Sequence, residues 1–319
     1  MPIPKKLENR CRVPVIGAPM FLISTPRLVI AQCKAGVIGA FPALNARPQS
    51  QLREWIKEIK QALSAHDQSE AGPKSAPFAV NLVALSTNKR FESDLEVCIE
   101  EKVPIIITSM RPPEEVAKRV HAYGGLHFHD VTTRRHAEKA IEAGVDGLIL
   151  VCAGAGGHGG LLNPFAFIKE VRSFYQQGMI IVAGCITTGQ EVRACEVVGA
   201  DMAYIGTGFI ATEEANAESA YKEMIIEAKS DDILYTPDFT GVNANFLKES
   251  IQNCGVNPET VSGPRVGRVS KFVLWWKHWR LKHVKRWAKL WSAGQGVTGI
   301  NQVSTVASYV NKLEAGYKL

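Results

Sequence analysis

A single histidine in a run of small residues is the residue best suited to acid–base chemistry. The segment Cys152-Ala-Gly-Ala-Gly-Gly-His-Gly-Gly160 surrounds His158 with five glycines and two alanines. A buried structural histidine normally packs against large neighbours, and this segment, the glycine–histidine loop, supplies almost none. Because an imidazole with an ordinary pKa of about 6.5 exchanges protons near neutral pH, we expect His158 to act as an acid or base. A flexible loop whose histidine only meets solvent is the alternative.

Two later segments have the composition of phosphate-binding loops. The Gly184 loop (183–189) reads Ala-Gly-Cys-Ile-Thr-Thr-Gly, and the Gly206 loop (206–209) reads Gly-Thr-Gly-Phe. Backbone N–H groups in such loops, and the helix N-termini that follow them, can approach phosphate oxygens closely. We therefore predict a phosphate site there, although ordinary turns between strands and helices also use glycine.

Small or amide side chains at other predicted strand ends leave room for a flat ring. These are Gly17-Ala18-Pro19-Met20, Asn81, which can both donate and accept hydrogen bonds, and Thr108-Ser109. A phosphate site, space for a planar ring and one polar histidine together indicate flavin mononucleotide (FMN).

His127 and His129 are two residues apart on a predicted strand, so their side chains lie on one face. They could bind a metal as a pair, but packing within the fold is favoured. No His-Glu-x-x-His or Cys-x-x-Cys pattern occurs, and we predict no metal site.

The elements that must position these residues alternate between short apolar strands and amphipathic helices. Eight strands are mostly apolar, as expected when helices cover parallel strands on both faces. An open doubly wound sheet could share this alternation, but no Gly-x-Gly-x-x-Gly follows the first strand. We predict a TIM (β/α)8 barrel, whose sites lie at the carboxyl ends of its strands. The predicted strands are Val13–Ile16, Val37–Phe41, Phe78–Leu82, Ile105–Thr108, Leu126–His129, Gly147–Val151, Ile180–Ala183 and Met202–Ile205.

The alternation stops near residue 230, which predicts a barrel over 1–230 and a mostly helical extension over 231–319. We expect irregular chain over 231–268 with a short helix near Asn245–Gln252, then a basic helix over 271–291 and a terminal helix over Asn301–Ala315. The basic segment holds seven Lys or Arg, no acidic residue and five of the six tryptophans. The favoured role of this segment is packing across the barrel. The alternatives are a contact between subunits, binding to an anionic membrane surface, or binding of an acidic cofactor. Binding of nucleic acid ranks lowest, because no known recognition module accompanies the segment.

The 319 residues are 46% hydrophobic and 21% charged, an ordinary globular balance. The net charge of +6 comes from the basic segment, because the rest of the chain holds 30 basic and 31 acidic residues. No apolar run is long enough to span a membrane, and the start MPIPKKLENR lacks a signal-peptide pattern. Seven scattered cysteines without paired spacing indicate a reducing cytoplasm.

These motifs together resemble the nitronate monooxygenase family, formerly called 2-nitropropane dioxygenases. The resemblance runs from about Val13 to Gly299 and includes the late Trp291-Ser-Ala-Gly-Gln-Gly296. It implies an FMN-dependent barrel in which His158 lies beside the flavin and is the catalytic base. The implied cofactor-binding residues are Ala18, Pro19, Met20, Asn81, Asp130 and Gly157; Ala183, Gly184, Cys185, Gly206, Thr207 and Gly208 at the phosphate; and Ser292, Gly294 and Gln295 in a turn that closes over the ring.

Three positions depart from the family pattern. Gly208 replaces an arginine, Cys185 replaces a glycine, and Asp130 stands where some members carry lysine near the flavin. A carboxylate does not stabilise a negative reduced flavin as an ammonium does, so the redox tuning and the substrate depend on Asp130.

Two enzymatic functions follow from the resemblance. One is oxidation of alkyl nitronates, or nitroalkanes, with O2 to a carbonyl compound and nitrite. The other is an NAD(P)H-dependent FMN reductase of quinones or enoyl thioesters. A flavin-binding protein without catalysis is a third hypothesis, and a homo-oligomer is left open.

Overall fold

The computed structural model describes residues 7, 9–69, 72–110, 114–264 and 289–319. Eight parallel strands form one sheet in the order β1-β9-β8-β6-β5-β4-β3-β2, and a bridge between Ile16 and Ile38 brings β1 beside β2. The sheet is thus nearly closed into the predicted barrel. Its strands are β1 Val15–Gly17, β2 Gly39–Pro42, β3 Phe78–Val83, β4 Ile105–Ser109, β5 Leu126–Val131, β6 Gly147–Val151, β8 Met179–Ala183 and β9 Met202–Ile205.

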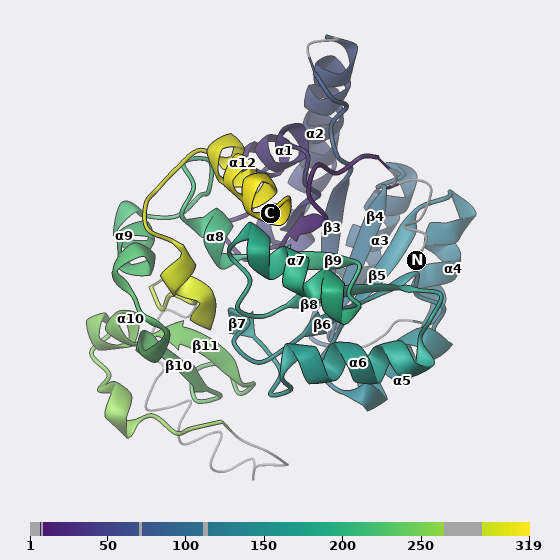
Figure 1. Cartoon of the computed structure of the whole chain (residues 1–319). Helices are drawn as coiled ribbons and strands as arrows, with labels where there is room; N and C mark the ends of the chain where they lie inside the picture. The colour runs from purple at the N-terminus through teal and green to yellow at the C-terminus, as the bar shows by residue number, and fades with distance from the viewer. Residues whose placement is uncertain (1–6, 8, 70–71, 111–113, 265–288) are drawn as a thin grey trace.

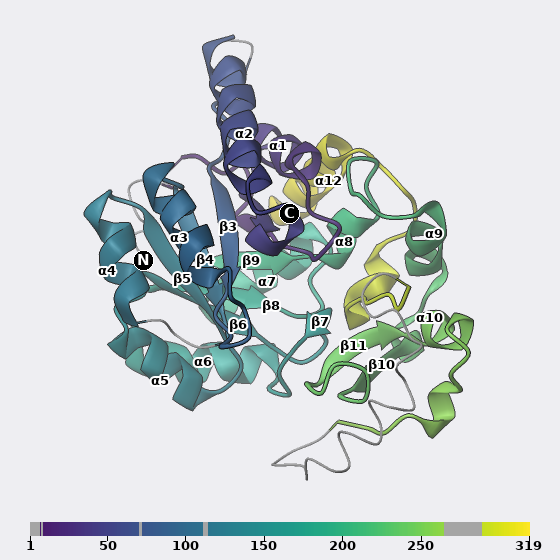
Figure 2. The same cartoon turned by 180° about the vertical axis from the view of Figure 1, so that it is seen from behind.

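Helices alternate with the strands and cover the outside of the barrel (Figures 1 and 2). Local signals mark several helix ends: Asn163 caps α6, Thr188 and Glu191 form a capping box on α7, and Gly199 ends α7 in the left-handed region. The helices are α1 Pro26–Ala35, α2 Gln51–Gln68, α3 Phe91–Glu100, α4 Glu114–Ala122, α5 Arg134–Glu142, α6 Pro164–Phe174, α7 Gly189–Val198, α8 Thr207–Ile210 and α9 Ser219–Glu227.

Strand side chains alternate between the barrel interior and the helices. On β5, Leu126 and Phe128 join the interior cluster, whereas His127 and His129 lie on the other face. Both rings contact the Thr108 hydroxyl at 2.7 Å, and burial lowers their pKa values to about 3 and about 4. The two histidines are therefore neutral packing residues, as favoured from the sequence.

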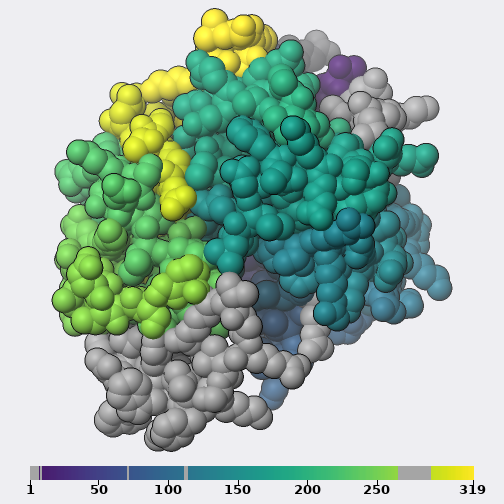
Figure 3. Space-filling view, turned by 60° about the horizontal axis from the view of Figure 1, so that its bottom comes forward, coloured from purple at the N-terminus to yellow at the C-terminus, as the bar shows by residue number. Residues whose placement is uncertain are grey.

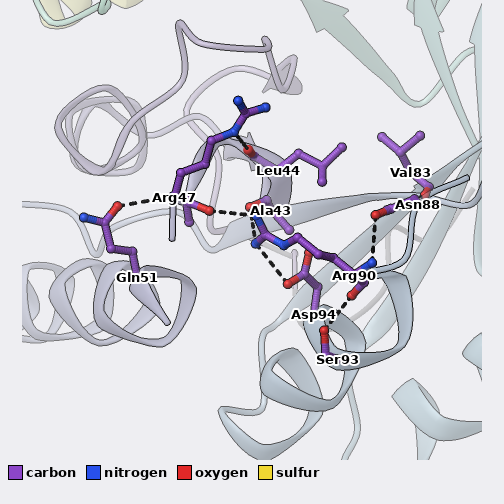
Figure 4. A network of polar contacts seen from close by, with 10 residues as sticks. Ala43, Leu44, Arg47, Gln51, Val83, Asn88, Arg90, Ser93 and Asp94 are labelled. Carbon is purple, nitrogen blue, oxygen red and sulfur yellow. Dashed lines mark hydrogen bonds and ion pairs between the residues drawn. The ribbon is translucent and has the colours of Figure 1, made fainter. Parts of the chain in front are cut away.

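Arg90 ties the loops after β2 and β3 together (Figure 4). Its guanidinium donates to the carbonyls of Ala43 and Ala46 and pairs with the buried carboxylate of Asp94 at 3.1 Å. Asn88 donates to the Val83 carbonyl at 2.9 Å at the start of the same loop. These contacts fix two loops at the carboxyl end of the barrel.

The segment after residue 230 contains a small sheet that the sequence analysis did not predict. Strands β10 (Ile233–Thr236) and β11 (Ala244–Leu247) pair antiparallel, and β11 also pairs with β7 (Gly157–His158). The expectation of irregular chain was wrong here, because four-residue strands separated by a turn give a weak pattern and the third strand is glycine and histidine. Asn245 lies in β11, and the helix predicted from there is α10, Lys248–Asn253.

The last helix, α12, spans Val306–Tyr317 and packs on α1 and α7 of the barrel. It begins five residues later than the predicted Asn301, because Thr305 is its N-cap. The predicted basic helix falls outside the described residues up to 288, and the described residues 289–291 are not helical. The division at residue 230 stays a prediction. Four short 3-10 turns, η1 Ala43–Asn45, η2 Ser230–Asp232, η3 Pro258–Thr260 and η4 Gln295–Gly299, complete the chain.

The described residues after 230, in green and yellow, lie beside the barrel (Figure 3). Among the described residues, no helix combines the length and the apolar character needed to cross a membrane. All seven cysteines are free.

Candidate functional site

His158 is held on an edge strand rather than in a flexible loop. In β7 it pairs with Ala244 of β11, and its Nε2 lies 3.1 Å from the Thr240 hydroxyl. That hydroxyl donates its own proton to the Val242 carbonyl at 2.8 Å, so it accepts from Nε2–H. In the neutral ring Nδ1 is then the basic nitrogen. Part of the side chain reaches solvent, while the surrounding loops desolvate the ring and lower its pKa, which keeps it unprotonated at neutral pH.

The turn predicted to close the site, Ser292–Gln295, fastens the glycine–histidine loop from the other side. Ser292 Oγ accepts from the Gly157 N–H and donates to the Asn245 carbonyl, both at 2.6 Å. The Gln295 N–H donates to the Gly154 carbonyl at 2.9 Å, and the Gly294 N–H donates to Thr207 Oγ1 at 2.9 Å. We call residues 292–295 the closing turn. It joins the loop after β6 to the Gly206 loop after β9.

Neighbouring strands place the two predicted phosphate loops side by side. Ala183 of β8 pairs with Tyr204 of β9, so the Gly184 and Gly206 loops leave the barrel at one edge. Gly184 and Cys185 have φ values of 131° and 56°. The left-handed region favours glycine, so Cys185 occupies a backbone position that its side chain makes costly.

Gly206 faces the residues after β1. A Cβ at position 206 would lie in ordinary van der Waals contact, 3.6 Å from Ala18 Cβ and from Met20 Sδ. Ala18 N donates to the Ile205 carbonyl at 2.8 Å. Asn45 Nδ2 donates to the Met20 carbonyl at 3.0 Å, and Pro19 lies between these two fixed residues. The residues after β1 therefore form a wall of defined shape against Gly206.

The replacement of arginine by Gly208 has a structural cause in α12. A Cβ on residue 208 would lie 2.0 Å from the Tyr309 hydroxyl, which donates to the Thr187 carbonyl at 2.8 Å. The Tyr309 ring also packs edge-on against Phe209, with centroids 5.1 Å apart. Tyr309 thus occupies the space that a side chain at position 208 would need, and it braces both phosphate loops.

Polar side chains line the floor of the barrel mouth. Asn81 Nδ2 donates to Ser109 Oγ at 2.8 Å, and Ser109 Oγ donates to Asp130 Oδ2 at 2.6 Å. Asp130 Oδ1 and Tyr204 Oη are buried and have no hydrogen-bond partner among the described residues. Burial raises the pKa of Asp130 to about 7, against the lowering effect of the Ser109 hydrogen bond.

The structure brings together the predicted residues of the phosphate loops, closing turn and glycine–histidine loop, with Asn81 and Asp130 inside the barrel mouth. It adds Thr240, Tyr204, Tyr309 and Asn245, which the sequence analysis missed. A tyrosine on the interior side of an apolar strand was the one available signal, at Tyr204. Within the described chain, no group of three His, Cys, Asp or Glu is placed to hold a metal ion.

A cavity of about 560 Å³ lies at the opposite end of the barrel, against the amino ends of β3, β4 and β5. Two of its cations have partners, because Arg10 donates to the Ser75 carbonyl and Lys60 contacts Glu101. Because barrel enzymes work at the other end of their strands, we do not assign the reaction to this cavity.

The model of the nitronate monooxygenase family matches residues 5–316. The chain belongs to the nitronate monooxygenase family. Two relatives show how low the sequence identity to this chain is within the family. The nitronate monooxygenase of Paraburkholderia phytofirmans is 26% identical over 281 residues, covering 77% of this chain and 76% of the relative. The probable nitronate monooxygenase of Staphylococcus aureus strain Newman is 26% identical over 283 residues, covering 77% and 79%.

Solved structures agree on the fold. FabK from Thermotoga maritima has a TM-score of 0.80 at 24% identity, covering 98% of this chain and 94% of that one. A nitroalkane oxidase from Streptomyces ansochromogenes has a TM-score of 0.76 at 21% identity, covering 98% of both chains. This nitronate monooxygenase family member is therefore an oxidoreductase, and the family implies a flavin cofactor and a small-molecule substrate.

Proposed function

We propose that this protein is an FMN-dependent enzyme that oxidises alkyl nitronates, or the nitroalkanes from which they form, with O2 to a carbonyl compound and nitrite. The observation that carries the proposal is the presentation of a neutral His158 from β7, in a loop that the closing turn fastens to the Gly206 loop. When bound, the flavin supplies the redox chemistry that links the substrate to O2.

The residues present fit such a cofactor. The backbone of the neighbouring Gly184 and Gly206 loops and the start of α8 would hold the phosphate. The unpartnered buried polar atoms of Asp130 and Tyr204 would contact the ring. We infer FMN rather than FAD because no second motif for an adenylate half follows from the sequence.

His158 would take the acidic α-proton of a neutral nitroalkane on its imidazole. Its lowered pKa favours the neutral, basic form at pH 7, and a proton taken there leaves Nε2–H still donating to Thr240. A preformed nitronate has already lost that proton. For such a substrate His158 would serve to position the anion.

The first test is anaerobic mixing of the flavin-loaded protein with a nitronate and, separately, with NADH. Bleaching of the visible flavin band by the nitronate supports the proposal. Bleaching by NADH alone would replace it with an NAD(P)H-dependent reductase of quinones or enoyl thioesters. A bound flavin that neither donor reduces would indicate a binding protein. Release of FAD instead of FMN on denaturation would contradict the cofactor assignment.

The second test replaces the base. His158→Asn should keep flavin binding while turnover of neutral nitroalkane falls by about 10² to 10⁴, with a smaller loss on preformed nitronate. Wild-type turnover of nitroalkane should fall as the pH drops through the pKa of His158. His136→Asn, on an exposed ring of α5, is the matched control and should leave both rates unchanged. Equal losses on both substrates would assign His158 to anion positioning instead.

A further inference from the structure

The floor of the barrel mouth contains two buried oxygen atoms that have no hydrogen-bond partner in the part of the chain that the structure describes. Tyr204 is 9% exposed, belongs to the interior cluster of the barrel, and its hydroxyl is one of these two atoms. Asp130 lies on β5 and Tyr204 on β9, with β6 and β8 between them in the sheet, so they reach the interior from different sides. Buried polar atoms are normally hydrogen-bonded, and an exception at a site indicates a missing partner.

The hydrogen-bond chain from β3 fixes how the Asp130 carboxyl is used. Asn81 donates a hydrogen bond to Ser109, and the Ser109 hydroxyl donates its own hydrogen bond to Asp130 Oδ2. Oδ2 is therefore an acceptor, and a proton held by this carboxyl sits on Oδ1, which is the unpartnered atom. Burial makes the protonated form accessible near neutral pH, since it raises the pKa of Asp130 to about 7.

Among the described residues, no cation acts on Asp130 to hold it ionised. Burial and the Ser109 hydrogen bond set its pKa, and the titratable group that acts on it from another strand is Tyr204. Burial and the nearby Asp130 raise the Tyr204 pKa well above its usual range, so the phenol keeps its proton. His129, next to Asp130 in the chain, points to the helix side and bonds to Thr108.

We propose that Asp130 and Tyr204 form the polar floor of the ligand site, each presenting a neutral O–H donor to an acceptor atom of a flat heteroaromatic ring in the barrel mouth. Asn81 and Ser109 are positioning residues, because they fix the Asp130 oxygen that carries the proton. This inference rests on the proposed function for the identity of the ring. It adds to the proposed function a role for Asp130 and Tyr204 in recognising the ring. It also adds an ionisation of Asp130 near pH 7 that changes the charge of the site.

The flavin-loaded protein provides the first test. Its visible absorption, titrated from pH 5 to 9, should show one transition centred near pH 7. Asp130→Asn should remove this transition and resemble the wild type at low pH. Ser109→Ala should move it to higher pH, because the lost hydrogen bond favours the ionised carboxyl. His158→Asn, which removes the other ionisable group of the site, should keep it.

Thermal unfolding of flavin-free protein tests the same group without the cofactor. The raised pKa means that the folded state keeps a proton that the unfolded state loses above about pH 4. Wild type should therefore lose stability relative to Asp130→Asn as the pH rises from about 4 to 7, with a constant difference above that.

Persistence of the wild-type transition in Asp130→Asn, or a bound flavin whose spectrum does not change with pH, would overturn the inference. A protein that binds no flavin would overturn the proposed function instead. In that case, a difference in melting temperature between wild type and Asp130→Asn that does not vary with pH would also contradict the raised pKa of Asp130.

Discussion

Gly189, the first residue of α7, provides the sharpest steric test of how the phosphate loops are held. A Cβ there would lie 2.0 Å from the Leu313 carbonyl oxygen, 2.3 Å from the Tyr317 nitrogen and 2.6 Å from the Gly316 carbonyl carbon. All three are backbone atoms of α12 and cannot rotate away. Since non-bonded contacts are favourable near 3.5 Å or beyond, Gly189→Ala requires α12 to retreat by roughly 1.5 Å.

The energetic cost lies between two limits. Overpacking of a fixed contact typically costs about 1 to 3 kcal/mol. Complete loss of α12 packing would expose four buried side chains, each worth roughly 1.5 to 3 kcal/mol. We expect Gly189→Ala to lower the free energy of unfolding by about 3 kcal/mol, which corresponds to roughly 5 °C in melting temperature. The buried side chains of α12 are Val306, Tyr309, Val310 and Leu313.

Gly316→Ala is the matched control on the opposite side of the same contact. Its Cβ would meet Gln190 Oε1 at 2.7 Å, but that atom ends a flexible, exposed side chain that can move. The backbone contact with Gly189 Cα, at 3.3 Å, needs only a small shift. A helical Gly→Ala change also gains up to about 1 kcal/mol of helix propensity, so this variant should cost much less than Gly189→Ala. Denaturant titration of both variants measures the difference. Equal effects from the two would refute the argument, as would a Gly189→Ala variant that retains wild-type stability and flavin affinity.

Two further variants test the closing turn and the phosphate loops. Ser292→Ala removes the acceptor of the Gly157 N–H and the donor to Asn245, and should cost about 1 to 3 kcal/mol and weaken flavin retention; a flavin Kd within twofold of wild type would contradict this role. Gly208→Ala should be destabilising in the wild type and less so in Tyr309→Ala, and a double-mutant cycle with no coupling would show that Tyr309 is not the cause.

The barrel strands could be predicted because their signals are local. Each is a short apolar run of β-branched residues covered on both faces, and strands such as Gly147–Val151 were predicted to the residue. The pair β7 and β11 could not be predicted in the same way. Gly157 and His158 have no strand propensity, and their partner is more than eighty residues away along the chain, so only the tertiary fold determines the pairing.

The residues of the candidate site also fall into two groups: those with a local signal in the sequence and those whose role depends on the tertiary fold. His158 and the two glycine loops were identifiable because glycine around a polar residue is unusual in the sequence itself. The roles of Thr240 and Tyr309 depend on which atoms they meet. Thr240 sets the tautomer of His158, and Tyr309 explains a departure at position 208 that the sequence presents only as a missing arginine.

Residues 289–319 have a direct structural effect on the candidate site at the barrel mouth. The hydroxyl of Ser292 spans the gap between β7 and β11 and so fixes the strand that carries His158. Tyr309, seventeen residues later, braces the Gly184 and Gly206 loops from the outside. Because a displacement of about 1 Å in a catalytic group can cost a hundredfold in rate, substitutions of Ser292 or Tyr309 should change turnover and flavin affinity together.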